Sequence, residues 1–248
     1  MCAASWCWSS TDRGPTRSGS EVTEGPEVIA ARPALAALAL ADPPDRWRAL
    51  GFAVGDDGHF ALGDIEIGLG AGGQGITGWT VTGAPGLDRA LGLTGPAGAP
   101  GAPRPGAPGA RAFPASGAGA PGEHPNGAIG LDHVVVIVPD FDATASALEH
   151  VGLPFRRVRQ ASETVRQGFR RLGPAILEVV ETPDATAPAF WGLVAVVADL
   201  EALATVAAPH IESPRPAVQP GRRIAPVRRS AGLSTRVAFM DPEPITSA

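Results

Sequence analysis

The clearest pattern along the chain is one long apolar strand followed by a helix and three shorter strands. Residues 131–138 are apolar almost throughout, as in a strand that is buried on both faces. Pro139 ends this run, and Asp140 or Asp142 can cap a following helix by accepting its free backbone N–H groups. Three strand candidates come next, at 154–159, 166–172 and 175–181. The predicted order of this module is βαβββ.

The same order of elements begins again towards the end of the chain. Residues 190–197 read as a strand, and Asp199 can cap a helix over 200–207. Two further strands are predicted at 222–228 and 234–240. Val138-Pro139-Asp140 in the first module aligns with Val197-Ala198-Asp199 in the second. The second half of the chain therefore contains two modules.

The first half carries a weaker copy of the pattern. Its elements are a strand at 34–41, a short helix capped by Asp42 or Asp45, and strand candidates at 51–54, 59–62 and 64–69. A fourth copy is reduced to a strand at 75–82 and a helix at 87–93. The glycine-rich residues 70–75 precede no helix, so they indicate a turn and not a phosphate loop. The sequence predicts the α+β class, with repeated βαβββ modules forming a curved, cup-shaped mixed sheet.

Composition divides the chain into four regions. Of the 34 residues at 94–127, 26 are Gly, Pro or Ala, a composition that predicts a solvated linker. The predicted regions are a disordered leader at 1–30, a degenerate module pair at 31–93, this linker, and a C-terminal domain at 128–248 with modules at 130–181 and 190–241.

The second half resembles the vicinal oxygen chelate superfamily, which includes glyoxalases and bleomycin-resistance-like proteins. The resemblance is carried by Gly130-Leu131-Asp132-His133-Val134-Val135-Val136, Pro139-Asp140, Gly152-Leu153-Pro154, and the strand from Leu172 to Glu181. It implies paired modules that curl into a cup. The superfamily includes isomerases, epimerases, dioxygenases, thiol transferases and drug binders, so the resemblance does not select one reaction.

The resemblance implies one divalent metal ion as the only cofactor, with His133 and Glu178 as its ligands. Such a metal could hold two neighbouring substrate oxygens. A catalytic site needs about three protein ligands, yet Gly192 aligns with His133 in the second module. The last ligand would have to come from a strand beyond Asp241, where Glu243 is the remaining carboxylate. The other interpretations of His133 are a hydrogen-bonded histidine of the core and a ligand-binding group without a metal.

Arginines provide the candidate ligand-binding groups. Arg166, Arg170 and Arg222 are candidates to hold a carboxylate or phosphate if their side chains line the cup. The alternative is that these arginines lie on the outer face and balance nearby Asp and Glu. Glu178 stands between two apolar residues and needs a partner, for which an arginine is the simplest choice.

Composition removes several classes of function. The net charge of −5 argues against nucleic acid or an acidic membrane surface as the partner. All 20 basic residues are Arg and there is no Tyr, which excludes a Schiff-base lysine and a catalytic tyrosine. Cys2 and Cys7 are too few for a disulfide framework, and no apolar run is long enough for a membrane span. We expect a cytoplasmic protein.

Three functions remain open at this point. The first is binding of a small anionic or aromatic molecule in a cup with an incomplete metal site. The second is a metal-dependent lyase, isomerase or dioxygenase of the glyoxalase type. The third is a non-catalytic scaffold for a homodimer.

Overall fold

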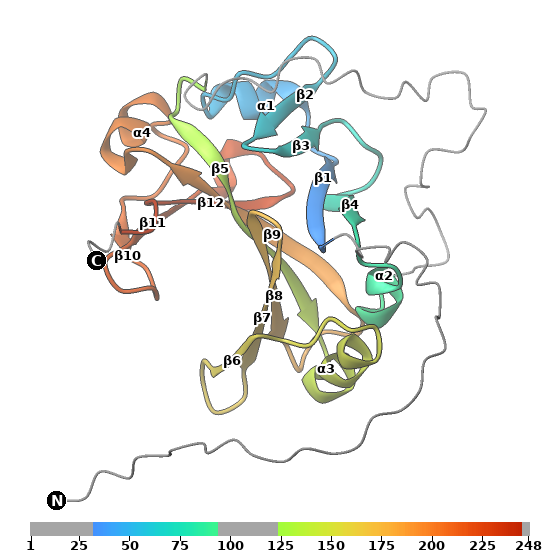
Figure 1. The fold of residues 1–248 in the computed structure, drawn as a ribbon. Helices are drawn as coiled ribbons and strands as arrows, with labels where there is room; N and C mark the ends of the chain where they lie inside the picture. Colours follow the sequence, from blue (N-terminus) through green and yellow to red (C-terminus); the bar gives the residue numbers. More distant parts are fainter. Residues whose placement is uncertain (1–31, 94–123, 245–248) are drawn as a thin grey trace, which may run out of the picture. The chain divides into compact units, whose positions relative to one another are not determined.

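The computed structural model describes residues 32–93 and 124–244. The predicted leader and residues 94–123 of the predicted linker lie outside these ranges. The described strands form one mixed sheet of eight strands and one of four (Figure 1). This arrangement confirms the predicted α+β class with repeated modules. None of the helices in the described ranges is long and apolar enough to cross a membrane.

The first C-terminal module has the predicted order. It consists of β5 (Ala128–Val138), α3 (Phe141–His150), β6 (Arg157–Gln160), β7 (Arg166–Leu172) and β8 (Ala175–Glu181). Asp140 is the helix cap, because its Oδ1 accepts a hydrogen bond of 2.9 Å from the Ala143 N–H. The first and fourth strands of the module, β5 and β8, pair in parallel, and β7 and β6 follow antiparallel. The bounds of β7 and β8 are those predicted, whereas β6 begins at Arg157 and not at residue 154.

The second C-terminal module repeats this arrangement. Its elements are β9 (Ala189–Val197), α4 (Leu200–Val206), β10 (Arg215–Pro216), β11 (Arg223–Pro226), the 3-10 turn η1 (Arg229–Ala231) and β12 (Arg236–Met240). Asp199 caps α4, as predicted. The parallel partner of β9 is β12, so the fourth strand of the module lies before Asp241. The expectation of a ligand-bearing strand beyond Asp241 is therefore wrong.

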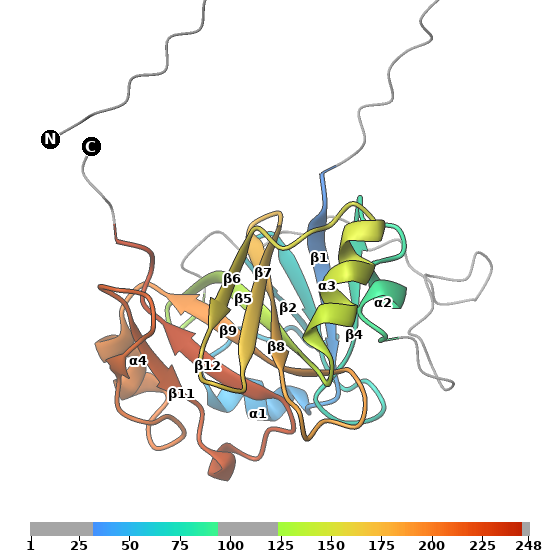
Figure 2. The same cartoon turned by 90° about the horizontal axis from the view of Figure 1, so that it is seen from below.

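Pairing between β5 and β9 joins the two modules into a single sheet. Its strand order is β10-β11-β12-β9-β5-β8-β7-β6, with the first strands of both modules at the centre. Figure 2 shows the outer strands of each module on either side of this central pair. The sheet thus has two wings, one from each module.

The N-terminal half contains an incomplete version of the same arrangement. Its elements are β1 (Ala34–Leu40), α1 (Pro44–Ala49), β2 (His59–Leu62), β3 (Ile65–Gly68), β4 (Ile76–Thr82) and α2 (Leu87–Ala90), with strand order β2-β3-β1-β4. As in the C-terminal half, the first strand pairs in parallel with one strand and antiparallel with the strand of the next module. Within residues 32–93, the fourth copy consists of the strand and the helix that the sequence predicts.

Two expectations for this half are wrong. Residues 51–54 form no strand; the Val54 and Gly55 carbonyl groups accept hydrogen bonds from the Arg48 side chain and not from a neighbouring strand. Neither Asp42 nor Asp45 caps α1, whose N-cap is Pro43. Asp45 instead pairs with Arg48 within the helix, and Asp42 has partners elsewhere, described below.

The described parts of both halves share one hydrophobic core. Phe52 contacts Trp47 and Phe60 within the N-terminal half and stacks on Phe239 of β12, with ring centroids 5.8 Å apart. Residues 124–127, which composition assigns to the linker, pack against the N-terminal half, since the Asn126 amide donates to the Leu50 carbonyl. The boundaries at 31–93, 94–127 and 128–248 stay predictions.

Candidate functional site

A cavity of about 1110 Å³ opens between the two wings of the eight-stranded sheet. Its floor is made by side chains of the central strands and of β8, among them Val135, Ile137 and Val180. The first wing adds Gln167 of β7, and the second wing adds residues of β10, β11, η1 and β12. This is the cup that the repeated modules predict.

His133 and Glu178 lie together in this cup. Strand alternation predicts that they share a face, and Glu178 stands opposite Val135 in the register of β5 and β8. Their side chains are in direct contact, with 3.3 Å between His133 Nε2 and Glu178 Oε2. Both line the cavity. The predicted spatial pair is present, and any role of the pair in holding a metal remains a prediction.

His133 is held from behind by a buried ion pair that the sequence analysis missed. Asp132 Oδ2 accepts a hydrogen bond of 2.7 Å from His133 Nδ1, which leaves Nε2 facing the cup. Asp132 Oδ1 accepts from the Arg222 guanidinium, whose side chain is only 3% exposed. Burial alone would raise the pKa of Asp132, but its hydrogen bonds and charge interactions with His133 and Arg222 bring that pKa below its usual range.

Glu178 has a neutral hydrogen-bond partner in place of the expected arginine. The Gln167 amide donates a bond of 2.8 Å to Glu178 Oε1. Burial raises the pKa of Glu178. The charges of His133 and Arg159 act to lower this pKa, but their effect is smaller than that of burial. The polar cluster of the cup therefore runs from Arg222 through Asp132 and His133 to Glu178 and Gln167.

The three predicted arginines do not line the cup. Arg166 and Arg170 share the opposite face of β7 from Gln167, because residues of a strand alternate between its faces. Arg166 pairs with Glu181 and Asp142, as the outer-face alternative anticipated, and Arg170 donates to the Pro154 carbonyl. Arg222 lies behind the cup, where it fixes Asp132.

A different set of arginines lines the second wing. They are Arg215, Arg228, Arg229 and Arg236. Within the described residues, none of the four forms an ion pair with a carboxylate. Arg236 lies against the ring of Trp191, which is 47% exposed and also lines the cavity. The cluster of arginines after residue 221 in the sequence indicated a cationic surface. Strand alternation could not show that these side chains line the cup, because they come from strand ends and a turn.

The residues of the second wing do not fit a metal. In the first module, His133 pairs with Ile176, and Glu178 lies two residues further along that strand. In the second module, Gly192 pairs with Arg236, and the residue two positions further along is Ala238. A Cβ atom on Gly192 would lie 2.4 Å from the Arg236 carbonyl oxygen, so no larger side chain fits there. In the described ranges no three His, Cys, Asp or Glu side chains are grouped as a metal site requires. The cup thus offers two candidate ligands and one cationic wing.

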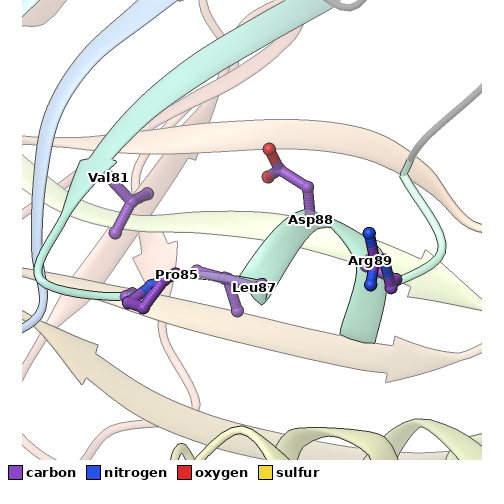
Figure 3. Close-up of a pocket in the computed structure, with 7 residues that line it drawn as sticks. Val81, Pro85, Leu87, Asp88 and Arg89 are labelled. Carbon is purple, nitrogen blue, oxygen red and sulfur yellow. The ribbon is translucent and has the colours of Figure 1, made fainter.

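A smaller cavity of about 510 Å³ lies beside α2 (Figure 3). Residue 81 and residues 84–89 line it, with Asp88 and Arg89 as its charged groups. Asp88 already accepts a hydrogen bond from the indole of Trp79. The larger cup is therefore the better candidate for a ligand site.

Several solved structures are similar to part of this chain. The methylmalonyl-CoA epimerase of Mycobacterium tuberculosis is 18% identical, with a TM-score of 0.40 over 48% of this chain and 91% of its own. A Streptomyces coelicolor methylmalonyl-CoA epimerase variant in complex with 2-nitronate-propionyl-CoA is 16% identical, with a TM-score of 0.39 over 48% and 97%. A hypothetical protein from Bacillus halodurans is 15% identical, with a TM-score of 0.38 over the same shares. No family model and no curated protein matches the chain.

The fold assignment rests on the strand order and register of the chain itself. Two βαβββ modules, joined through their first strands, enclose one cup. The chain has the fold of the vicinal oxygen chelate superfamily. In this vicinal oxygen chelate fold the polar cluster of the first wing faces the arginines of the second across the cavity.

Proposed function

We propose that the chain binds a small anionic molecule in the cup. The supporting observation is the arginine wall, formed by Arg215, Arg228, Arg229 and Arg236, which has no carboxylate partner among the described residues. Guanidinium groups present paired N–H donors that match the oxygens of a carboxylate or phosphate. An anion from solution would supply the missing partner.

The rest of the cup favours an apolar or aromatic body on this anion. Its floor is formed by aliphatic side chains, and the Trp191 ring is half-exposed beside it. Apolar surface gains free energy when a ligand covers it, at about 25 cal/mol per Å². His133 and Gln167 add hydrogen-bonding groups on the opposite wing. The ligand class is therefore a small molecule with one anionic end and one apolar end.

A metal-dependent lyase, isomerase or dioxygenase is the second function that the resemblance implied. It would need ligands that Gly192 and Ala238 do not provide. A homodimer scaffold stays a prediction, since the described residues carry no observation that selects it. The arginine wall favours the binding function over both.

Binding can be tested with a matched panel of probes on the full chain. We expect benzoate and phenyl phosphate to change the tryptophan fluorescence, through Trp191, and neutral benzamide to have at least tenfold lower affinity. Arg229→Gln should weaken benzoate binding at least tenfold, because it removes one guanidinium of the wall. Arg157→Gln removes the same charge from an exposed position on β6 and should leave binding unchanged.

Two results would overturn the proposal. One is equal binding of benzoate and benzamide, which would remove the role of the negative charge. The other is equal loss on Arg229→Gln and Arg157→Gln, which would reduce the effect to net charge. Trp191→Phe should abolish the fluorescence change while calorimetry still detects the anion.

A further inference from the structure

Asp42 has an unusual place among the aspartates that follow the first strands of the modules. Asp140 and Asp199 each cap the helix that comes next. Asp42 follows β1, but the residue is 1% exposed and its side chain makes no cap. Its carboxylate binds a segment almost two hundred residues further along the chain. A buried carboxylate is costly unless it is fully hydrogen-bonded, so these partners decide whether it is tolerated.

The partners of Asp42 lie in the segment 228–235, which we name the arginine loop. Asp42 Oδ1 accepts hydrogen bonds from the Ser234 backbone N–H and from the Ser234 hydroxyl, the latter at 2.8 Å. It also accepts from the Thr235 N–H at 3.3 Å. These charge-assisted bonds join the N-terminal half to the last residues before β12.

The glycine-rich turn at 70–75 supports the same contact. The Gly75 N–H donates a hydrogen bond of 2.8 Å to the Ser234 hydroxyl oxygen. Ser234 therefore bridges Gly75 and Asp42. A side chain on Gly232 would meet the Arg46 guanidinium at 3.1 Å, and the backbone of Gly232 has a φ of 75°, which favours glycine. The N-terminal half thus holds the loop at several points.

The arginine loop carries half of the arginine wall. Arg228, Arg229, Leu233, Ser234 and Thr235 of this loop line the cup. The backbone bonds within the loop are those of a single short turn at residues 228–232. Its first residue is also held by the C-terminal half, because Arg228 donates from its backbone N–H to the His210 carbonyl and from its side chain to the Ile211 carbonyl. The part of the loop after Arg228, which includes the exposed Arg229, depends on the contacts with the N-terminal half for its position.

We propose that Asp42 is a positioning residue, which fixes the arginine loop and thereby sets the affinity of the cup for its anion. The degenerate N-terminal half then has a function, since it holds one wall of a site in the C-terminal half. The affinity part of this inference rests on the proposed binding function. The anchoring part stands without it, because it concerns the loop alone.

Trypsin measures the anchoring independently of any ligand. The chain has no Lys, so trypsin cleaves only after arginines, two of which are Arg228 and Arg229. Asp42→Ala should raise the cleavage rate at these two positions about tenfold, measured by mass spectrometry well below the melting temperature. Asp42→Asn keeps an acceptor oxygen and should restore most of the protection. Ser234→Ala, which changes an exposed residue, should have a smaller effect in the same direction.

A matched control separates positioning from general stability. Leu91→Ala truncates a buried side chain of the N-terminal half that is outside the contact with the loop. It should lower the melting temperature without selective cleavage at Arg228 and Arg229. Benzoate affinity should fall several-fold in Asp42→Ala, recover in Asp42→Asn and remain at the wild-type level in Leu91→Ala.

Each outcome decides one part of the inference. Unchanged cleavage at Arg228 and Arg229 in both Asp42→Ala and Ser234→Ala would overturn the anchoring. Faster cleavage with unchanged benzoate affinity would overturn the link between the anchor and the cup. If the wild-type chain binds neither benzoate nor phenyl phosphate, the proposed function fails, while faster cleavage still supports the anchor. If Asp42→Ala does not fold, the cleavage rate of Ser234→Ala against that of the wild-type chain tests the anchoring.

Discussion

The two halves of the molecule place a glutamate at the same position of the same framework. Glu66 pairs with Ala37 across β1 and β3, as Glu178 pairs with Val135 across β5 and β8. The neighbouring strand contributes a polar partner in both cases, with 2.8 Å between His59 Nδ1 and Glu66 Oε1. In the C-terminal half the partner is Gln167, at the corresponding register. The glutamate on this strand and its polar partner on the neighbouring strand are therefore shared by both halves.

The halves differ in what faces that glutamate. The four-stranded sheet has no counterpart of β10, β11 and β12 within residues 32–93, and the Glu66 side chain is 32% exposed. In the C-terminal half these strands form the second wing, and Glu178 is 13% exposed at the edge of a large cavity. The second wing, and not the glutamate alone, therefore distinguishes the C-terminal half, because it encloses the cavity beside Glu178.

The buried polar cluster marks the largest difference between the halves. Leu35 and Ala34 occupy the register positions of His133 and Asp132. We expect Arg222→Met to cost about 3 kcal/mol of stability, because it leaves the Asp132 carboxylate buried without its cation. The double variant Asp132→Ala with Arg222→Met copies the apolar pattern of the N-terminal half and should be more stable than the single variant. Urea unfolding of both variants measures the difference.

The pH dependence of unfolding sharpens this test. The pKa of Asp132 is lowered in the folded state, so its stabilisation is present above its ordinary value of 3.8 and is lost as pH falls through the lower folded value. Arg222→Met should reduce this acid-dependent loss, since the pKa of Asp132 then rises towards its ordinary value or above it. An unchanged acid limb, or a double variant less stable than the single one, would contradict this account of the cluster.

Part of this arrangement could be predicted from the sequence. Long apolar runs and aspartate caps fixed β5, β9, α3 and α4, because local signals determine such elements. The pairing of His133 with Glu178 followed from strand alternation and the family resemblance. The partners of Asp132 could not be predicted, because Arg222 lies 90 residues away and the register of β11 has no local signal.

Asp42 shows the limit of local reasoning most clearly. Its position after a strand and before Pro43-Pro44 is typical of a helix cap, and sequence analysis gave Asp42 and Asp45 as the two candidates for that role. The carboxylate instead accepts from Ser234, 192 residues away, and the Gly75 N–H of the turn at 70–75 donates to the same hydroxyl. Neither partner has a local signal in the sequence around Asp42. The arginine wall was missed for a similar reason, since a 3-10 turn and strand ends have no alternation to read.

A substitution at Gly192 tests whether β12 of the second wing leaves room for a side chain at a position where the N-terminal half carries one. Gly192 pairs with Val135, and the matching position of the N-terminal half is Thr80, which pairs with Ala37 and is exposed. Gly192→Thr should cost about 1–3 kcal/mol, because its Cβ would collide with the Arg236 backbone and strain the pairing of β9 with β12. Thermal unfolding with Thr80→Gly as the reciprocal change gives the comparison, and that variant should lose about 1 kcal/mol or less. Equal losses would mean that crowding by β12 does not distinguish the halves.

The smallest expected effect concerns the two glutamates themselves. Burial raises the pKa of Glu178 above its ordinary value of 4.5, so the folded state favours the protonated carboxyl. Stability should therefore fall as pH rises from 4.5 through the folded value, because the ionised group is better solvated in the unfolded chain. Glu178→Gln keeps an oxygen for the Gln167 amide and removes the charge.

We expect Glu178→Gln to stabilise the chain at pH 7 by about 1 kcal/mol or less and to have no such effect below pH 4.5. Glu66→Gln is the matched change in the N-terminal half, where the side chain is more exposed, and its effect at pH 7 should be smaller than that of Glu178→Gln. Thermal unfolding of both variants across this pH range provides the measurement. A loss of stability at pH 7 in Glu178→Gln would show that the ionised carboxylate gains more from His133 than it loses on burial. In that case the glutamate of the cup would be held as an ion, and the contrast with Glu66 would lie in its partner and not in its burial.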